Sequence, residues 1–176
     1  FPSTHLVKPI ASNGGFVIPQ WLDHFGNDEE GHLRRQAISM AINRKQISDK
    51  IMNGTRVPAK DFTATTLGDV PNVEGSDVLD YNPDKAKELW KKADDIKPYS
   101  GKLEISYNSD GGHKEWVEAV SNSIHNVLGI DATGKAYPNF KALRNEVSSG
   151  SIHTAFRSGW QADFPSQANF LQPQFA

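Results

Sequence analysis

The fold is decided by residues 103–128, which read LEISYNSDGGHKEWVEAVSNSIHNVL. Leu103, Ile105 and Tyr107 alternate with polar residues, as they do in a β-strand. A turn with two glycines follows, and apolar residues then recur at helical spacing until Gly129 ends the pattern. A short strand therefore leads into the longest predicted helix of the chain.

The same alternation continues toward the C-terminus. A strand pattern covers residues 130–137, a helix pattern covers residues 140–150, and the apolar run 152–156 reads as a buried strand. Strands that alternate with helices predict an α/β fold with a mainly parallel sheet flanked by helices.

The N-terminal half contains more helices and one weak strand. Residues 16–22 are apolar, but Pro19 cannot donate to a ladder, so we expect an edge or irregular strand after an extended or looping segment. Residues 55–78 read as a long surface excursion. Three helices are predicted from their start signals, at Asp28, Asn43 and Asn82.

Composition excludes several classes of protein. The chain has 176 residues, a net charge of -2 and no cysteine, and its basic residues are scattered, so nucleic acid is not an expected partner. No apolar run approaches the roughly 20 residues that span a bilayer, so no direct membrane insertion is expected. The six histidines show no ligand spacing, and no P-loop or dinucleotide fingerprint is present, which predicts neither metal nor cofactor.

Residues 156–165 carry the clearest chemical signal, with Arg157, Trp160 and Asp163 directly after the predicted strand. An arginine suits a carboxylate and an aspartate suits an ammonium, with Trp160 as an apolar wall, so these types fit a zwitterionic ligand such as a peptide. They fit equally well an internal ion pair between Arg157 and Asp163.

His113 is a second candidate, because it stands after two glycines at the start of the long helix. A helix N-terminus keeps a histidine neutral and is a natural seat for an anion. The alternative is an ordinary surface histidine.

The order of these motifs resembles the large extracellular solute-binding proteins of the oligopeptide and dipeptide ABC-transporter family (bacterial family 5). The resemblance runs from about residue 16 to the end of the chain. It is carried by five motifs, namely LRRQAISMAINR (33–44) with Gly54 and Pro58-Ala59 behind it, NPDKAKELW (82–90), LEISYN with the His113 helix, LGI (128–130) and GWQADF (159–164).

The resemblance implies one lobe of a type II periplasmic-binding-protein fold. Residues 1–15 are then a leading segment from a second lobe, residues 16–172 the substrate-binding lobe, and residues 173–176 the exit toward the second lobe. The expected function is capture of a peptide by closure of two lobes and delivery to an ABC permease, outside the cell or in the periplasm, by a protein that is lipid-anchored or secreted.

The resemblance also assigns roles to residues. Asp163 occupies the position that holds the α-ammonium of the peptide, whereas Arg157 and His113 occupy positions that receive its carboxyl end for some ligand lengths. Phe164 replaces the commoner tyrosine. A further arginine of some members has no counterpart, because Val147 and Ser148 stand there and Arg144 is out of register.

Two other functions remain open at this point. The chain can belong to a receptor for a non-peptide solute, such as an oligosaccharide or metal chelate, or to one used for signalling, in which case Asp163 is structural. A hydrolase that uses Asp163 and His113 needs a further nucleophile or acid that the sequence does not indicate. We therefore expect a binding protein and no enzyme.

Overall fold

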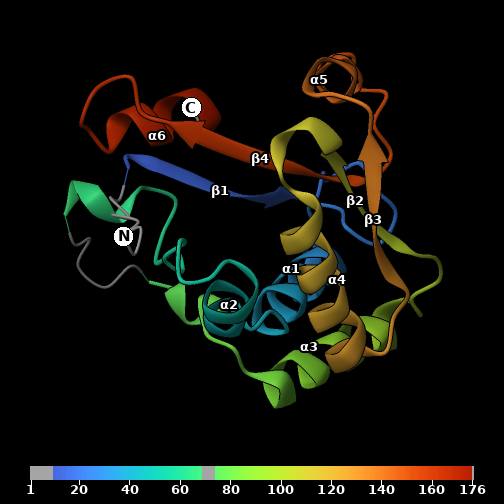
Figure 1. Ribbon diagram of the computed structural model, residues 1–176. Helices are drawn as coiled ribbons and strands as arrows, with labels where there is room; N and C mark the ends of the chain where they lie inside the picture. Colours follow the sequence, from blue (N-terminus) through green and yellow to red (C-terminus); the bar gives the residue numbers. More distant parts are fainter. Residues whose placement is uncertain (1–9, 69–73, 176) are drawn as a thin grey trace.

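A four-stranded sheet organises the part of the chain that the computed structural model describes, residues 10–68 and 74–175 (Figure 1). The strand order is β1-β4-β2-β3. β2 pairs in parallel with β3 and with β4, whereas β1 pairs antiparallel with β4. The predicted α/β fold with a mainly parallel sheet is thus confirmed. The strands are β1 (Ser12–Val17), β2 (Leu103–Asn108), β3 (Ala132–Tyr137) and β4 (Ala155–Gln161).

Two helical crossovers connect the parallel strands. α4 (Lys114–Leu128) leads from β2 to β3, and α5 (Phe140–Ser148) leads from β3 to β4. Both faces of β2 are covered, since the adjacent residues Ile105 and Ser106 are both fully buried. The buried hydroxyl of Ser106 is satisfied by Thr154 at 2.6 Å.

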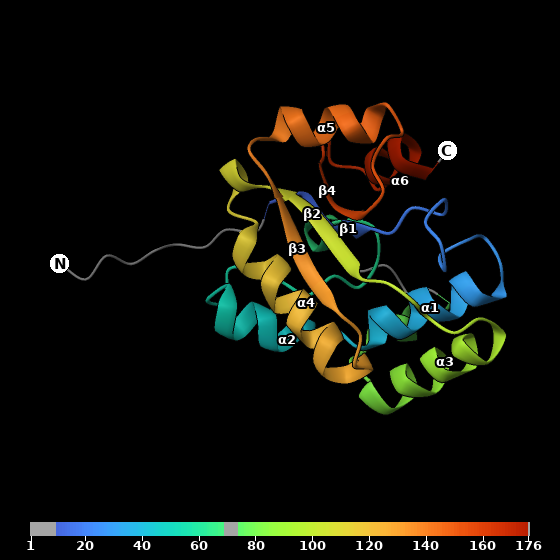
Figure 2. The ribbon, with the colours of Figure 1, turned by 90° about the vertical axis from the view of Figure 1, so that its right-hand side faces the viewer.

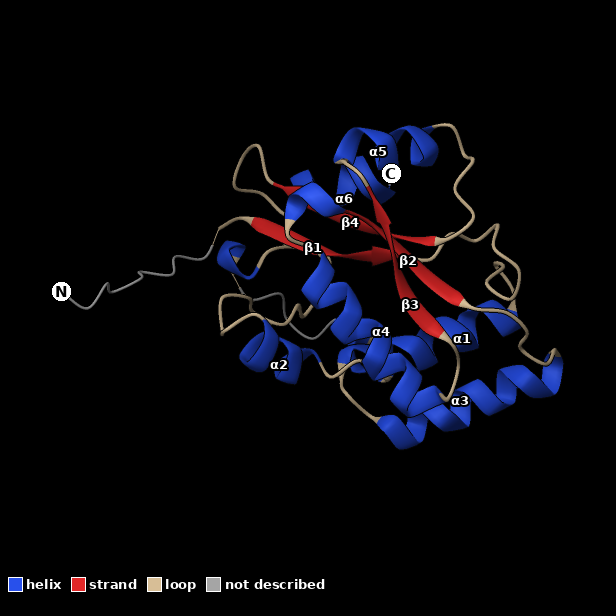
Figure 3. Cartoon of the chain, turned by 45° about the vertical axis from the view of Figure 1, so that its right-hand side comes forward, coloured by secondary structure: helices blue, strands red, loops and turns tan. Residues whose placement is uncertain are grey.

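The helices divide into two layers, as Figures 1 and 2 show from two sides. α1 (Glu29–Met40) and α3 (Pro83–Ile96) pack against each other and, with α4, bury the larger apolar cluster. α5 covers a smaller cluster formed by Tyr137, Leu143 and Ile152. The sheet lies between these layers (Figure 3).

The predicted helix starts are confirmed by their caps. The side chains of Asp28, Asn43 and Asn82 accept hydrogen bonds from backbone N–H groups three residues later, at 2.8, 3.0 and 3.0 Å. Such caps satisfy N–H groups that have no partner inside the helix. The shorter helical segments are α2 (Arg44–Gln46), the π-helical η1 (Ile47–Ile51), and the 3₁₀ turns η2 (Thr65–Leu67), η3 (Ser76–Leu79) and η4 (Ser109–Gly111).

The predicted limits were wrong for two of the four strands, β1 and β4. β4 runs from Ala155 to Gln161 and not from 152 to 156, and β1 begins at Ser12, inside the segment expected to loop. The reason is mutual pairing: Ser12 lies opposite Gln161 and Val17 opposite Phe156, so each segment supplies the other's hydrogen bonds. The start of β1 was not predicted because it contains Gly14 and Gly15, and glycine is typical of turns.

The C-terminal part also differs from expectation, since α6 (Ala168–Phe175) follows β4 where no helix was expected. Its Phe170 is fully buried, which ties the helix to the rest of the molecule. Of the predicted leading and exit segments, residues 1–9 and Ala176 lie outside the described residues, as do residues 69–73 of the surface excursion. No helix among the described residues has both the length and the apolar character needed to cross a membrane.

Candidate ligand-binding site

The candidate site lies where β2 and β4 separate. β4 pairs with β2 only at Ala155 and Phe156, and β2 ends at Asn108. Beyond this point β4 continues with β1 as its partner, while η4 and the start of α4 follow β2. Parallel sheets commonly bind ligands at the carboxyl ends of strands where neighbouring connections diverge.

Arg157 is the first residue of β4 beyond its pairing with β2, and its side chain is half-buried. Its Nε donates to Nε2 of His113 at 3.1 Å, and its guanidinium lies 5.0 Å from the centre of the Phe140 ring. Burial lowers the pKa of Arg157, and the charge of Asp110 opposes this shift. No carboxylate of the described residues forms an ion pair with Arg157, so its positive charge is open to a ligand.

His113 is the N-cap residue of α4, and a hydrogen-bond donor lies near each nitrogen of its ring. Nδ1 lies 3.1 Å from the indole nitrogen of Trp116, and Nε2 lies 3.1 Å from Arg157. Burial lowers the pKa of His113, the charges of Arg157 and Arg56 lower it further, and Asp110 acts in the opposite direction. The lowered pKa favours the neutral imidazole, and burial is the largest cause of the shift.

Asn108 and Gly111 complete this part of the site. A side chain at Gly111 would meet Nδ2 of Asn108 and Nε2 of His113, each 2.6 Å from the ideal Cβ position. Asn108 donates to Asp110 at 2.6 Å, whereas its own Oδ1 is buried without a hydrogen-bond partner. The hydrogen bond from Asn108 lowers the pKa of Asp110. The close approach explains why glycine stands at position 111.

Trp160 and Asp163 belong to a separate group at the far end of β4. The indole N–H of Trp160 and the backbone N–H of Asp163 both donate to Oδ1 of Asn169 in α6, at 2.9 and 3.0 Å. The side chain of Asp163 is exposed. Asn169 thus fixes the chain direction at Asp163 and leaves its carboxylate free to face solvent.

The structure separates Arg157 from Trp160, which the sequence analysis grouped as neighbours around one ligand. The two residues are three positions apart in one strand, so their side chains lie on opposite faces of β4. The structure instead pairs Arg157 with His113. Arg157 and Asp163, both within the described residues, form no ion pair, so the internal pair considered from the sequence is not present.

One edge of β4 remains open between these two groups. From Arg157 to Gln161 the strand pairs with β1 on one side, and no strand of the described residues pairs with its other side. Figure 1 shows β1 and β4 extending together beyond β2 and β3. An open edge presents backbone N–H and C=O groups that an extended peptide can pair with.

Several residues of the site were missed by sequence reasoning. Trp116 and Phe140 were not identified as site residues, although they contact His113 and Arg157, respectively. Asn108 carried a usable signal, because it is a polar residue at the end of a buried strand. Asn169 carried none, since α6 itself was not recognised.

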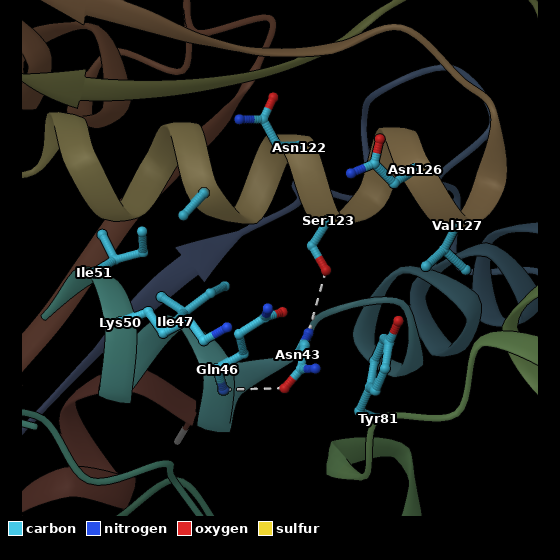
Figure 4. A pocket seen from close by; sticks show the side chains of 11 residues that line it. Asn43, Gln46, Ile47, Lys50, Ile51, Tyr81, Asn122, Ser123, Asn126 and Val127 are labelled. Atoms are coloured by element: carbon cyan, nitrogen blue, oxygen red, sulfur yellow. Dashed lines mark hydrogen bonds between the residues drawn. The ribbon is translucent and has the colours of Figure 1, made fainter.

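A groove on another part of the surface does not include the predicted site residues. A groove of about 290 Å³ lies between η1 and α4, lined by the amides of Asn43, Gln46, Asn122 and Asn126 and by Tyr81 (Figure 4). None of the four predicted site residues lines it. Among the described residues, no three His, Asp or Glu side chains are grouped so that they could hold a metal ion.

Comparison with known proteins identifies the family. The family model described as "Bacterial extracellular solute-binding proteins, family 5 Middle" matches residues 31–176. The chain belongs to this family. Its members are solute-binding proteins that act outside the cytoplasm, as the family description states.

Named relatives of this family-5 chain are peptide-binding proteins. It is 30% identical over 149 residues to a dipeptide-binding protein of Lactococcus lactis and 27% identical over 147 residues to the oligopeptide-binding protein OppA of Bacillus subtilis. Each alignment covers 78% of this chain and 26% of the relative. The chain therefore spans about a quarter of the length of these relatives.

Solved structures give the same fold. The murein tripeptide-binding protein MppA of Escherichia coli aligns with a TM-score of 0.78 at 22% identity, over 93% of this chain and 32% of MppA. The binding protein DppA of Helicobacter pylori, solved with the peptide STSA, aligns with a TM-score of 0.74 at 26% identity, over 92% of this chain and 29% of DppA. The family-5 chain thus has the type II periplasmic-binding-protein fold that the sequence predicted.

Proposed function

We propose that the chain is the substrate-binding lobe of a peptide receptor that serves an ABC transporter. The observation that supports this most is the open edge of β4, with the unpaired charge of Arg157 at one end and the exposed carboxylate of Asp163 beyond the other. A peptide has a backbone to pair with the edge and opposite charges at its two ends. The names of the relatives support the same class of ligand.

In this proposal Asp163 binds the α-ammonium of the peptide, and Arg157 with His113 receives the carboxyl end. Guanidinium and carboxylate form charge-assisted hydrogen bonds, which are among the strongest in proteins. Arg157 and Asp163 are six residues apart, or at most about 20 Å in an extended strand, so a ligand that uses both charges has at most about six residues. Trp160 supports the site through Asn169 and is not a wall beside Arg157.

Closure of a second lobe completes the site. The proposed lobe contains the predicted residues 16–172 and also the first residues of β1, which begins at Ser12. The segments on either side of this lobe join the second lobe. A ligand that contacts both lobes only when they are closed binds the closed state more tightly and so drives closure. The closed receptor then delivers the peptide to the permease from the outer side of the membrane, held there by a lipid anchor or free after secretion.

The ammonium role is tested by calorimetry on the intact receptor that contains this chain. We expect Asp163→Ala to weaken the binding of two- to five-residue peptides by about 10-fold or more, because a hydrogen bond to a charged group is worth about 1.5–3 kcal/mol. Asp77→Ala, which removes an exposed carboxylate in η3, is the matched control and leaves the affinity unchanged. Equal affinities of wild type and Asp163→Ala would show that Asp163 does not bind the ammonium.

Native mass spectrometry of the purified intact receptor tests the class of ligand. We expect bound masses that fragment into amino-acid residues. A bound oligosaccharide or metal chelate would overturn the proposal of a peptide receptor, because the relatives would then share the fold without sharing the ligand.

A further inference from the structure

The ring of His113 faces a hydrogen-bond donor at each of its nitrogens. The indole nitrogen of Trp116 lies 3.1 Å from Nδ1, and Nε of Arg157 lies 3.1 Å from Nε2. Neither partner can reverse its role, because an indole N–H and a guanidinium N–H only donate. Trp116 and Arg157 are therefore the donors and His113 is the only possible acceptor in both contacts.

No protonation state of His113 satisfies both donors. A neutral imidazole accepts at one nitrogen and carries a proton on the other, and the imidazolium accepts at neither. The charged groups around the ring favour the neutral form: Arg157 on β4 and Arg56 after η1 lower its pKa in addition to burial, and Asp110 in η4 opposes them. One of the two donors therefore faces an N–H group in the ligand-free site.

The donor that is satisfied is Arg157, on energetic grounds. Its bond to His113 is charge-assisted, and such bonds are roughly twice as strong as those between neutral groups. The proton of the neutral ring then resides on Nδ1, and the indole N–H of Trp116 has no acceptor on His113. In the ligand-free site the indole N–H of the half-buried Trp116 thus lacks its acceptor on His113.

We propose that His113 changes tautomer when the carboxylate of a ligand binds to Arg157, and that Trp116 is a positioning residue that stabilises the bound tautomer. This rests on the proposed function. The carboxylate replaces Nε2 as the acceptor for Arg157. The ring releases its Nδ1 proton to water and takes one from water at Nε2, so no net proton is bound or lost.

All three donors are satisfied in the bound arrangement. Nε2–H of His113 and Nε–H of Arg157 both donate to the carboxylate, and Nδ1 accepts from Trp116. Because the bond from Trp116 forms only when ligand is present, it contributes to affinity. A ligand group that only donates hydrogen bonds would not release the ring from Arg157.

The first test needs no ligand. Long-range ¹H–¹⁵N spectra of the chain labelled with ¹⁵N-histidine distinguish the two tautomers by their nitrogen shifts. We expect the Nδ1–H form in the ligand-free wild type and the Nε2–H form in Arg157→Met, where Trp116 no longer competes with a guanidinium. An Nε2–H ring in the wild type, or an Nδ1–H ring in the variant, would overturn the inference whatever the receptor binds.

The second test uses the intact receptor and two- to five-residue peptides. We expect peptide binding to convert His113 to the Nε2–H form, and Trp116→Phe to weaken affinity about 2- to 10-fold, the value of one hydrogen bond. Trp21→Phe removes another indole N–H, which donates to the carbonyl of Ile152, and leaves the affinity unchanged.

Different results would overturn the tautomer change and the proposed peptide-receptor function. A receptor that binds peptide while His113 keeps its proton on Nδ1 would overturn this inference alone. A receptor that binds no peptide would overturn the proposed function, and the ligand-bound part of this inference with it.

Discussion

Arg34 and Arg157 have similar aromatic neighbours but differ in burial and in their polar partners. Both guanidinium groups lie against aromatic rings, Arg34 at 4.5 Å from Trp90 and Arg157 at 5.0 Å from Phe140. Arg34 is fully buried and pairs with two carboxylates, those of Glu30 at 2.8 Å and Asp94 at 3.1 Å. Arg157 is half-buried, and its hydrogen-bond partner is the neutral His113.

The difference separates a structural arginine from one available to a ligand. A buried charge is tolerated when counter-charges and hydrogen bonds surround it, as they surround Arg34. Glu30 also contacts His24 at 2.7 Å, so the cluster of Arg34 is linked further into the molecule. Arg157 forms no ion pair with a carboxylate of the described residues and lies beside an open strand edge, which is the arrangement that attracts an anion.

The largest expected effect is on the structural side of this comparison. Arg34→Met leaves Glu30 and Asp94 without their cation, and breaking a buried pair costs about 3–5 kcal/mol. We expect that loss in the free energy of unfolding, measured by urea denaturation, with less than about 1 kcal/mol for Arg157→Met. Equal losses in the two variants would remove the distinction between the arginines.

A smaller effect is expected from Gly111→Ala. The new methyl group would displace Asn108 or His113, and overpacking of this kind costs about 1–3 kcal/mol. We expect both a lower unfolding free energy and weaker peptide binding, because a displaced His113 no longer reaches the carboxylate that Arg157 binds. Gly15→Ala is the control, since nothing lies within 4 Å of the added methyl group there. Wild-type affinity in Gly111→Ala would show that the position of His113 is not needed.

The cluster of Arg34 also predicts a dependence of stability on pH. Burial raises the pKa of Glu30, but hydrogen bonds from His24 and Arg34 outweigh it and hold that pKa below its ordinary value. A carboxyl group with a lowered pKa stabilises the fold above its unfolded pKa, and this contribution is lost as the pH falls through the folded pKa.

The contribution is about 1.4 kcal/mol for each unit by which the pKa is lowered. Urea denaturation at about pH 7 and about pH 3 should therefore show a larger loss in wild type than in Glu30→Gln. A loss of the same size in both proteins would contradict the assigned role of Glu30.

The smallest expected effect is a shift in the titration of His113. The charge of Arg157 contributes to lowering the pKa of His113, so Arg157→Met should raise that pKa. Arg34→Met should leave it unchanged, because Arg34 is not among the groups that act on His113. NMR titration of the His113 ring measures its pKa in both variants. A pKa that changes in Arg34→Met and not in Arg157→Met would contradict the assigned influence of Arg157 on His113.

The sequence was sufficient for the fold class because caps and periodicity are local. Asn82, Asp28 and Asn43 act within four residues of themselves, and the alternation of strands and helices after residue 103 specifies the crossovers. The pairing of β1 with β4 joins segments about 145 residues apart, and no local pattern indicates it. That pairing determines the length of β4 and therefore the face on which each site residue lies.

The candidate site was predicted in part for the same reason. His113 was correctly placed at the start of its helix, and the resemblance to family 5 named Arg157 and Asp163. Their contacts were not predictable, since Phe140 and Asn169 come from other elements. Arg34 shows the converse: the start signal at Asp28 predicted its helix, but not that Arg34 is fully buried. Its pairing with Glu30, one turn before it, allows this burial.

The most direct test of the account is a comparison of matched peptides with a free carboxylate and with a C-terminal amide. Calorimetry of the intact receptor, for lengths of two to five residues, should show that at least one length loses about 10-fold or more in affinity on amidation, since the pair with Arg157 is charge-assisted. Arg157→Met should abolish this difference. Equal binding of acid and amide by wild type at every length, or an undiminished preference for the acid in Arg157→Met, would contradict the role of Arg157.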